Sequence, residues 1–98
     1  MNKRYLIDEL IDILEKVQAN ITDESDMVWT QYNTPKELWD ELDTYIRELK
    51  DGSTMGIKRI YMLFLPTATL QEHSMSNGWA DEYLKLSERF DELYSNDK

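Results

Sequence analysis

The side chain best suited to chemistry at neutral pH is His73, the only histidine of the chain. An imidazole titrates near neutrality and can bind a metal ion or act as a base. On a helix, a second metal ligand would lie three or four residues away, and those positions hold Thr69, Leu70, Ser76 and Asn77. Ser76 could reach the imidazole, yet no G-x-S-x-G elbow accompanies it. We therefore expect His73 to be a surface or boundary histidine without a catalytic role.

Metal and phosphate sites of the common kinds are not predicted. The chain has no cysteine, which excludes thiolate zinc sites. Its carboxylates fall opposite the apolar residues of the expected helices, so they should face water rather than a metal ion. Residues 23–26 lack the alternation and the glycine of an EF-hand loop, and neither a Walker A motif nor a G-x-G-x-x-G motif occurs. We predict no metal, no cofactor and no catalytic residue in a protein that is not an enzyme.

One set of candidate binding residues lies between the first two expected helices. It combines the acids Asp23, Glu24 and Asp26 with the aromatic residues Trp29 and Tyr32. Exposed aromatic side chains rimmed by acids are typical of a protein-binding surface with anchor residues. The alternative, which we favour for the two aromatic residues, is that they pack over the bundle as a lid.

A second set of candidates is polar and follows the apolar run that ends at Leu65. Its members are Thr67, Thr69, Gln71, Glu72, His73 and Trp79. A few convergent polar groups over an apolar floor are typical of small-ligand pockets. Turn and capping chemistry explains most of this polar density, because a helix must end and another begin here. The pocket is therefore the alternative hypothesis.

Charge narrows the range of partners. The chain has 98 residues and a formal net charge of −9, a length that predicts one domain, residues 1–98. Neutralising phosphates requires a basic surface, so we predict no nucleic-acid partner and no binding to an anionic membrane. A basic protein partner is compatible with this charge, although surplus acid also serves solubility.

The same sequence indicates a cytoplasmic protein. The N-terminal apolar stretch meets Asp8 and Glu9 after only three residues, too soon for a signal peptide. The longest apolar run, residues 61–65, is too short to span a bilayer. The absence of cysteine fits a reducing compartment.

The elements that would position these side chains are predicted to be helices. Apolar residues recur with helical spacing over residues 2–19, 35–50 and 78–94. The second helix has the clearest limits: Thr34, Pro35 and Glu37 form a capping box with proline at the first helical position, and Gly52 follows its end. Residues 22–33 have no helical period and are expected to form an aromatic lid loop.

The middle of the chain is harder to assign. We predict short helices over residues 55–65 and 68–76, which completes an all-α compact bundle of four to five helices. Because residues 61–65 are apolar without a break, the alternative is an α+β fold with a short hairpin from residues 27–32 and 57–65.

These features favour a non-enzymatic protein-interaction module, such as an inhibitor or immunity-type partner of a basic protein. The alternative is a small-molecule-binding domain with its pocket around residues 67–79. Homodimerisation is a further possibility, since the apolar stripe from Leu38 to Leu49 is wide for one small core.

Overall fold

Five helices make up the protein. The computed structural model describes residues 3–28, 30–65 and 68–97. The helices are α1 (Lys3–Ala19), α2 (Pro35–Lys50), α3 (Ile57–Leu63), α4 (Thr69–Ser76) and α5 (Ala80–Asp97). No strand occurs in these residues, so the predicted all-α bundle is confirmed and the alternative hairpin is wrong. Residues 57–63 are helical, and the described part of residues 27–32 forms turns.

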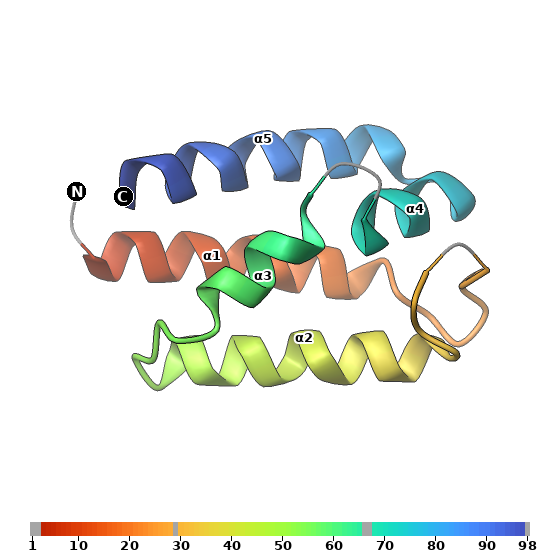
Figure 1. Ribbon diagram of the computed structural model, residues 1–98, viewed down its shortest axis with the longest axis horizontal. Coiled ribbons are helices and arrows are strands. Elements are labelled where there is room, and N and C mark those ends of the chain that lie inside the picture. The colour runs from red at the N-terminus through yellow and green to blue at the C-terminus, as the bar shows by residue number, and fades with distance from the viewer. Residues whose placement is uncertain (1–2, 29, 66–67, 98) are drawn as a thin grey trace.

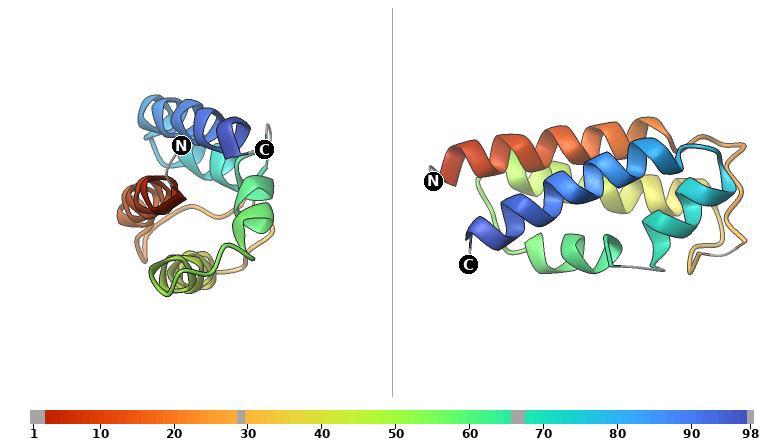
Figure 2. Two further views of the ribbon diagram at one scale, coloured as in Figure 1. Left: turned by 90° about the vertical axis from the view of Figure 1, so that its left-hand side faces the viewer. Right: turned by 90° about the horizontal axis from the view of Figure 1, so that it is seen from above.

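The long helices run side by side, with α1 between α2 and α5 (Figure 1). Viewed along the bundle, α1, α2, α3 and α5 surround the interior, and the short helix α3 closes the side opposite α1 (Figure 2). Both termini lie at one end of the bundle, whereas the α1–α2 loop and the α4–α5 turn lie at the other end (Figure 1).

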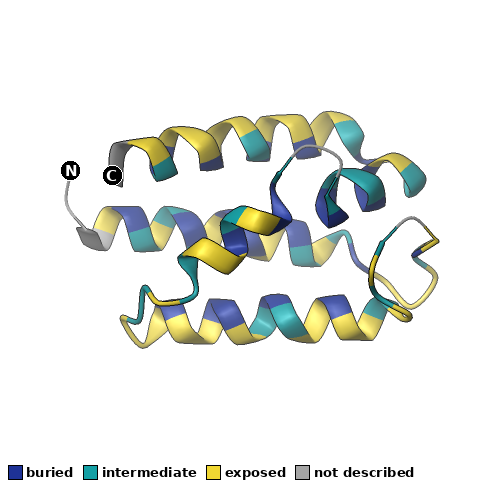
Figure 3. Ribbon diagram, in the orientation of Figure 1, coloured by how far each residue is buried: buried dark blue, intermediate teal, exposed yellow. Residues whose placement is uncertain are grey.

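Helical spacing of apolar residues places one face of each long helix in the core (Figure 3). The α2 stripe is fully covered within the single chain, since Leu38 and Leu42 are 0% exposed and Leu49 is 2% exposed. The stripe is thus covered without a second chain, and sedimentation at micromolar concentration measures the oligomeric state directly.

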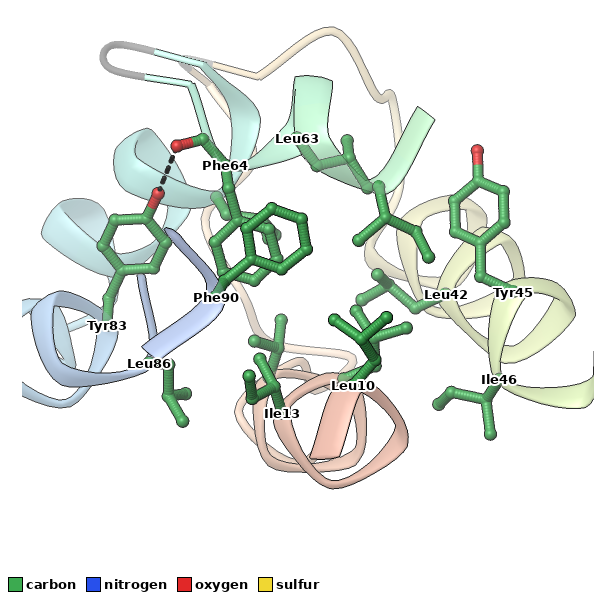
Figure 4. Packing of buried hydrophobic residues seen from close by; sticks show 14 of the residues in the cluster. Leu10, Ile13, Leu42, Tyr45, Ile46, Leu63, Phe64, Tyr83, Leu86 and Phe90 are labelled. Carbon is green, nitrogen blue, oxygen red and sulfur yellow. Dashed lines mark hydrogen bonds between the residues drawn. The ribbon is translucent and has the colours of Figure 1, made fainter. Parts of the chain in front are cut away.

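Aromatic rings from α5 and from Phe64, the residue that follows α3, fill the centre of the core (Figure 4). Phe90 stacks on Phe64, with ring centroids 4.5 Å apart and an interplanar angle of 5°. Tyr83 donates a hydrogen bond from its hydroxyl to the Phe64 carbonyl oxygen (3.4 Å). The apolar run that could have been a strand thus continues a helix as far as Leu63. This helix buries one face only, because Ile60 and Leu63 are buried whereas Met62 is 58% exposed.

The ends of α2 follow from local chemistry. The Thr34 hydroxyl accepts a hydrogen bond from the Glu37 N–H (3.3 Å), and Pro35 is the first helical residue. Gly52 has φ of +88°, a backbone angle that glycine adopts without the strain of a side chain. The predicted limits of this helix, residues 35–50, match the observed ones.

Thr34→Ala is expected to lower the free energy of unfolding by about 1 kcal/mol, because the substitution leaves a helix N-terminal N–H without its partner. Urea denaturation followed by circular dichroism measures this loss. Thr44→Ala is the matched control: Thr44 is exposed within the same helix and bonds to the Asp40 carbonyl oxygen (3.0 Å). Its replacement should leave stability unchanged or slightly higher. Equal losses for the two variants would contradict the capping role.

The helices of the described chain include none that is long and apolar enough to cross a membrane.

Candidate functional site

Residues 20–28 and 30–34 form turns and bends at the end of the bundle away from the termini (Figure 1). The turns are held by local side-chain bonds: the Thr22 N–H donates to the Ser25 hydroxyl (3.0 Å), and the Val28 N–H donates to the Asp26 carboxylate (3.0 Å). Met27 is buried in the core, but Val28 is 68% exposed. Ile21 is also buried, and Tyr32 packs against the core, so the loop is anchored by several side chains and open to solvent at Val28.

Asn77, which follows α4, connects this loop to the C-terminal half of the chain by hydrogen bonds. Its side-chain oxygen accepts a hydrogen bond from the Asp26 N–H (2.7 Å), and its amide donates to the Asp26 carbonyl oxygen (2.9 Å). The same amide donates to the His73 carbonyl oxygen at the end of α4 (2.9 Å). A second asparagine, Asn20, links α1 to α5 by donating to the Glu82 carboxylate (3.2 Å).

These links bring together acids that are distant in sequence. We call the following exposed carboxylates the acidic end: Asp23, Glu24 and Asp26 from the loop, with Asp81 and Glu82 from the first turn of α5. None of them forms an ion pair with a described side chain. The nearby cations Lys16 and Lys36 are paired with acids of their own helices, and Lys85 on α5 has no ion pair with a described acid.

Apolar surface adjoins the acidic end. Trp39 on α2 is 39% exposed. It borders a groove of about 460 Å³ that Ile21, Thr22, Asp23, Pro35 and Lys36 also line. A second hollow of about 510 Å³ lies at the α4–α5 turn, where Asp81, Glu82 and Trp79 are among its lining residues. Carboxylates, an indole and two shallow hollows thus share one end of the molecule.

Trp39 was not among the residues predicted from sequence, because it lies at the flank of a helical stripe that suggested packing alone. Of the two aromatic residues predicted together with the loop acids, the structure describes only Tyr32. Tyr32 is half-buried, packs against the core, and has a buried hydroxyl without a hydrogen-bonding partner among the described residues. Trp29 lies outside the described residues.

His73 is fully buried, with 0% of its surface exposed, so the expectation of a surface or boundary histidine is wrong. The Trp79 indole N–H donates to His73 Nδ1 (3.0 Å), which makes the imidazole neutral with its proton on Nε2. Nε2 itself has no partner among the described residues. Burial lowers the pKa of His73 below its ordinary value of 6.5, and Asp26 opposes part of this shift.

The other polar candidates of residues 67–79 do not converge on one cavity. Gln71 and Glu72 are half-buried, and the buried Ser74 hydroxyl donates to the Gln71 carbonyl oxygen (2.8 Å). Thr69 and Trp79 line different hollows. Thr67 lies outside the described residues. The residues predicted to form one pocket are therefore spread between the core and two surfaces.

A cavity that sequence reasoning missed lies where α2, α3 and the start of α4 meet. It has a volume of about 520 Å³ and is lined in part by Glu41, Tyr45, Arg59 and Thr69. The Tyr45 hydroxyl donates to the Glu41 carboxylate (2.9 Å). Burial and this bond raise the pKa of Tyr45 to about 12, so the hydroxyl is protonated at neutral pH.

Few arrangements in the described chain could support catalysis. No group of three or more His, Cys, Asp or Glu side chains in the described residues could hold a metal ion. The one imidazole is sealed in the core and receives its hydrogen bond from an indole, not from a nucleophile. Comparison with protein-family models, curated proteins and solved structures gave no match. The site must therefore be interpreted from its own geometry.

Proposed function

We propose that this protein is a non-enzymatic interaction module that binds a partner protein with a basic surface through the acidic end. The observation that carries the proposal is that unpaired carboxylates of the loop and of α5 lie at the same end of the bundle. The hydrogen bond between Asp26 and Asn77, which are 51 positions apart in the sequence, holds these two parts of the chain together. Among the described side chains, no basic residue is a partner of these acids. They are free to meet the charges of another molecule.

Electrostatics makes such a surface effective in association. The net charge of −9 attracts a basic partner from a distance, and complementary patches accelerate encounter. Val28 and Trp39 beside the acids supply apolar contact area, and indoles are frequent anchors of interfaces. An inhibitor or immunity-type protein that covers the basic site of its target would use a surface of this kind.

The competing proposal, a small-molecule pocket around residues 67–79, has less support. Thr69 lies in one cavity and Trp79 in another, and His73 has no exposed surface. A protein-binding role is also consistent with the absence of a metal cluster or an accessible nucleophile–base pair in the described residues.

Neutralising four carboxylates of the acidic end is expected to weaken partner binding about fourfold or more, since each exposed charge pair contributes roughly 0.2–1 kcal/mol. The variant carries Asp23→Asn, Glu24→Gln, Asp81→Asn and Glu82→Gln. Asp26 is not replaced, because its carboxylate accepts the hydrogen bond from the Val28 N–H that helps to hold the loop. Immobilised protein is exposed to an extract of its native host at low and high salt, and captured proteins are identified by mass spectrometry.

A matched control makes the outcome specific. Replacing the exposed acids Asp8, Glu48, Glu88 and Glu92 by their amides changes the net charge equally but leaves the acidic end intact. The proposal requires a basic protein that the wild type and the control capture, and that high salt and the acidic-end variant release. Trp39→Ala should also weaken its capture, whereas Leu84→Ala, at a 58% exposed site, should not. If neither high salt nor the acidic-end substitutions reduce the capture of the partner, the proposal is overturned.

A further inference from the structure

The cavity between α2, α3 and α4 has the dimensions of a small-ligand site. Its volume of about 520 Å³ falls within the usual range of ligand pockets, roughly 300–1,000 Å³. None of the residues that line it belongs to the acidic end, although Gln31 comes from the same loop. Its function can therefore be considered separately from partner binding.

Two side chains of opposite charge line this cavity without pairing. Glu41 accepts a hydrogen bond from Tyr45, but no cation of the described chain lies within ion-pairing distance of it. Arg59 likewise has no ion pair with a described acid, Glu41 included. Among the other described cations, Lys58 and Lys85 also lack an acid partner, whereas five have one: Lys16, Lys36, Arg47, Lys50 and Arg89. The cavity thus offers one anionic and one cationic anchor.

The Glu41 carboxylate is also held in place. It is half-buried, and the Tyr45 hydroxyl fixes one of its oxygens at 2.9 Å. In Figure 4 the Tyr45 hydroxyl points away from the apolar cluster, so the pair belongs to the cavity side of α2. A partly desolvated carboxylate binds a cation more strongly than a fully hydrated one, because the effective dielectric constant is lower.

The remaining surface of the cavity is mixed. Met62, Leu63 and Leu65 provide apolar contacts, and the Thr69 hydroxyl and the Gln31 amide add polar groups. A guanidinium group binds a carboxylate with two parallel hydrogen bonds, which orients the ligand. The complementary ligand therefore has a carboxylate for Arg59, an ammonium for Glu41 and an apolar portion between or beside them.

We infer that this cavity, formed by Glu41, Tyr45, Arg59 and Thr69 with an apolar wall, binds a small zwitterion with an apolar side chain, an α-amino acid or a dipeptide. The ligand supplies to each charged anchor the partner that the protein itself does not provide. A simple amine would use only Glu41, and a simple carboxylate would use only Arg59.

Ligand titrations of the ¹⁵N-labelled full chain test this inference, with L-leucine and L-leucyl-L-leucine as the probes. At least one of them should give saturable shifts in the millimolar range or below at the amides of Arg59, Leu63 and Thr69. Two analogues remove one charge each: 3-methylbutylamine lacks the carboxylate, and 4-methylpentanoate lacks the ammonium. Each should bind at least about tenfold more weakly, because a charge-assisted hydrogen bond is lost.

Variants assign the two charges to their anchors. Glu41→Gln and Arg59→Gln should each lower the affinity for the probe that binds the wild type by at least about tenfold. Glu48→Gln and Lys58→Gln, at exposed positions of the same helices and outside the cavity lining, should bind it as the wild type does. The dispersed amide spectrum of each variant reports that it is folded. The inference is overturned if neither zwitterion gives saturable shifts at the cavity, if an analogue with one charge binds equally well, or if the anchor variants bind like their controls.

Discussion

Phe90→Ala is expected to lower the free energy of unfolding by about 3–5 kcal/mol, the usual loss for deleting a fully buried aromatic ring. Phe90 is 0% exposed and lies at the centre of the core. Its ring stacks on Phe64 at 4.5 Å and lies 5.8 Å from Tyr94 and 6.3 Å from Tyr61. Alanine would remove the contacts that hold α5 against α3. Since a domain of this size is stable by only roughly 5–15 kcal/mol, a large part of its stability would be lost.

Chemical denaturation monitored by circular dichroism measures this loss. Leu84→Ala is the control on the same helix, because Leu84 is 58% exposed and its loss should change stability by less than about 0.5 kcal/mol. Phe90→Leu keeps most of the apolar volume and should fall between the two. A Phe90→Ala protein within about 1 kcal/mol of the wild type would show that the centre of the core lies elsewhere.

The helices were predictable from the sequence because their signals are local. The limits of α2 follow from Thr34, Pro35 and Gly52, each of which acts on its own backbone or within one helical turn. Helix α5 runs to Asp97, beyond the predicted residue 94, since no proline or glycine ends it earlier. Helix α3 was ambiguous because residues 61–65 are apolar without a break, although Met62 among them is 58% exposed; an apolar residue on the outer face obscures the 3.6-residue period.

The candidate sites were less predictable because they depend on which segments meet. Helical spacing correctly placed most carboxylates on the outside, but it does not show which of them share a surface. The acidic end exists because Asn77 reaches the loop and Asn20 reaches α5, contacts across 51 and 62 positions of the sequence. The cavity at Glu41 and Arg59 likewise requires the relative placement of three helices. No local pattern specifies such distances.

The same reasoning explains the error at His73. Its neighbours on α4 are a mixture of polar and apolar residues, which suggests a boundary position. Its burial comes from residues outside α4. The ring of Trp79, the residue before α5, packs against the imidazole, and Asn77 binds the loop at Asp26 next to the end of α4. The polar groups of this region are therefore structural bonds that join the loop to the bundle.

That burial makes stability depend on pH. As the pH falls below about 6.5, we expect the free energy of unfolding of the wild type to decrease through His73. The sign follows from protonation: the pKa of His73 is ordinary in the unfolded chain but lowered by burial in the folded protein, with Asp26 only partly opposing the shift. Between the two pKa values the unfolded chain binds more protons. The stabilisation is thus complete above the unfolded pKa and is lost as the pH falls through the folded pKa.

The structural reason is the hydrogen bond from the Trp79 indole, because a protonated imidazole has donors on both nitrogens and can no longer accept at Nδ1. Urea denaturation at several values between about pH 7.5 and 5 measures the slope, and the indole N–H signal reports the local bond. His73→Gln keeps an acceptor for the indole but cannot take up a proton in this range, so its slope should be smaller. Glu72→Gln removes a charge from the same helix and should keep the wild-type slope. Parallel wild-type and His73→Gln curves over this interval would show that protonation of the buried imidazole does not limit the stability of the fold.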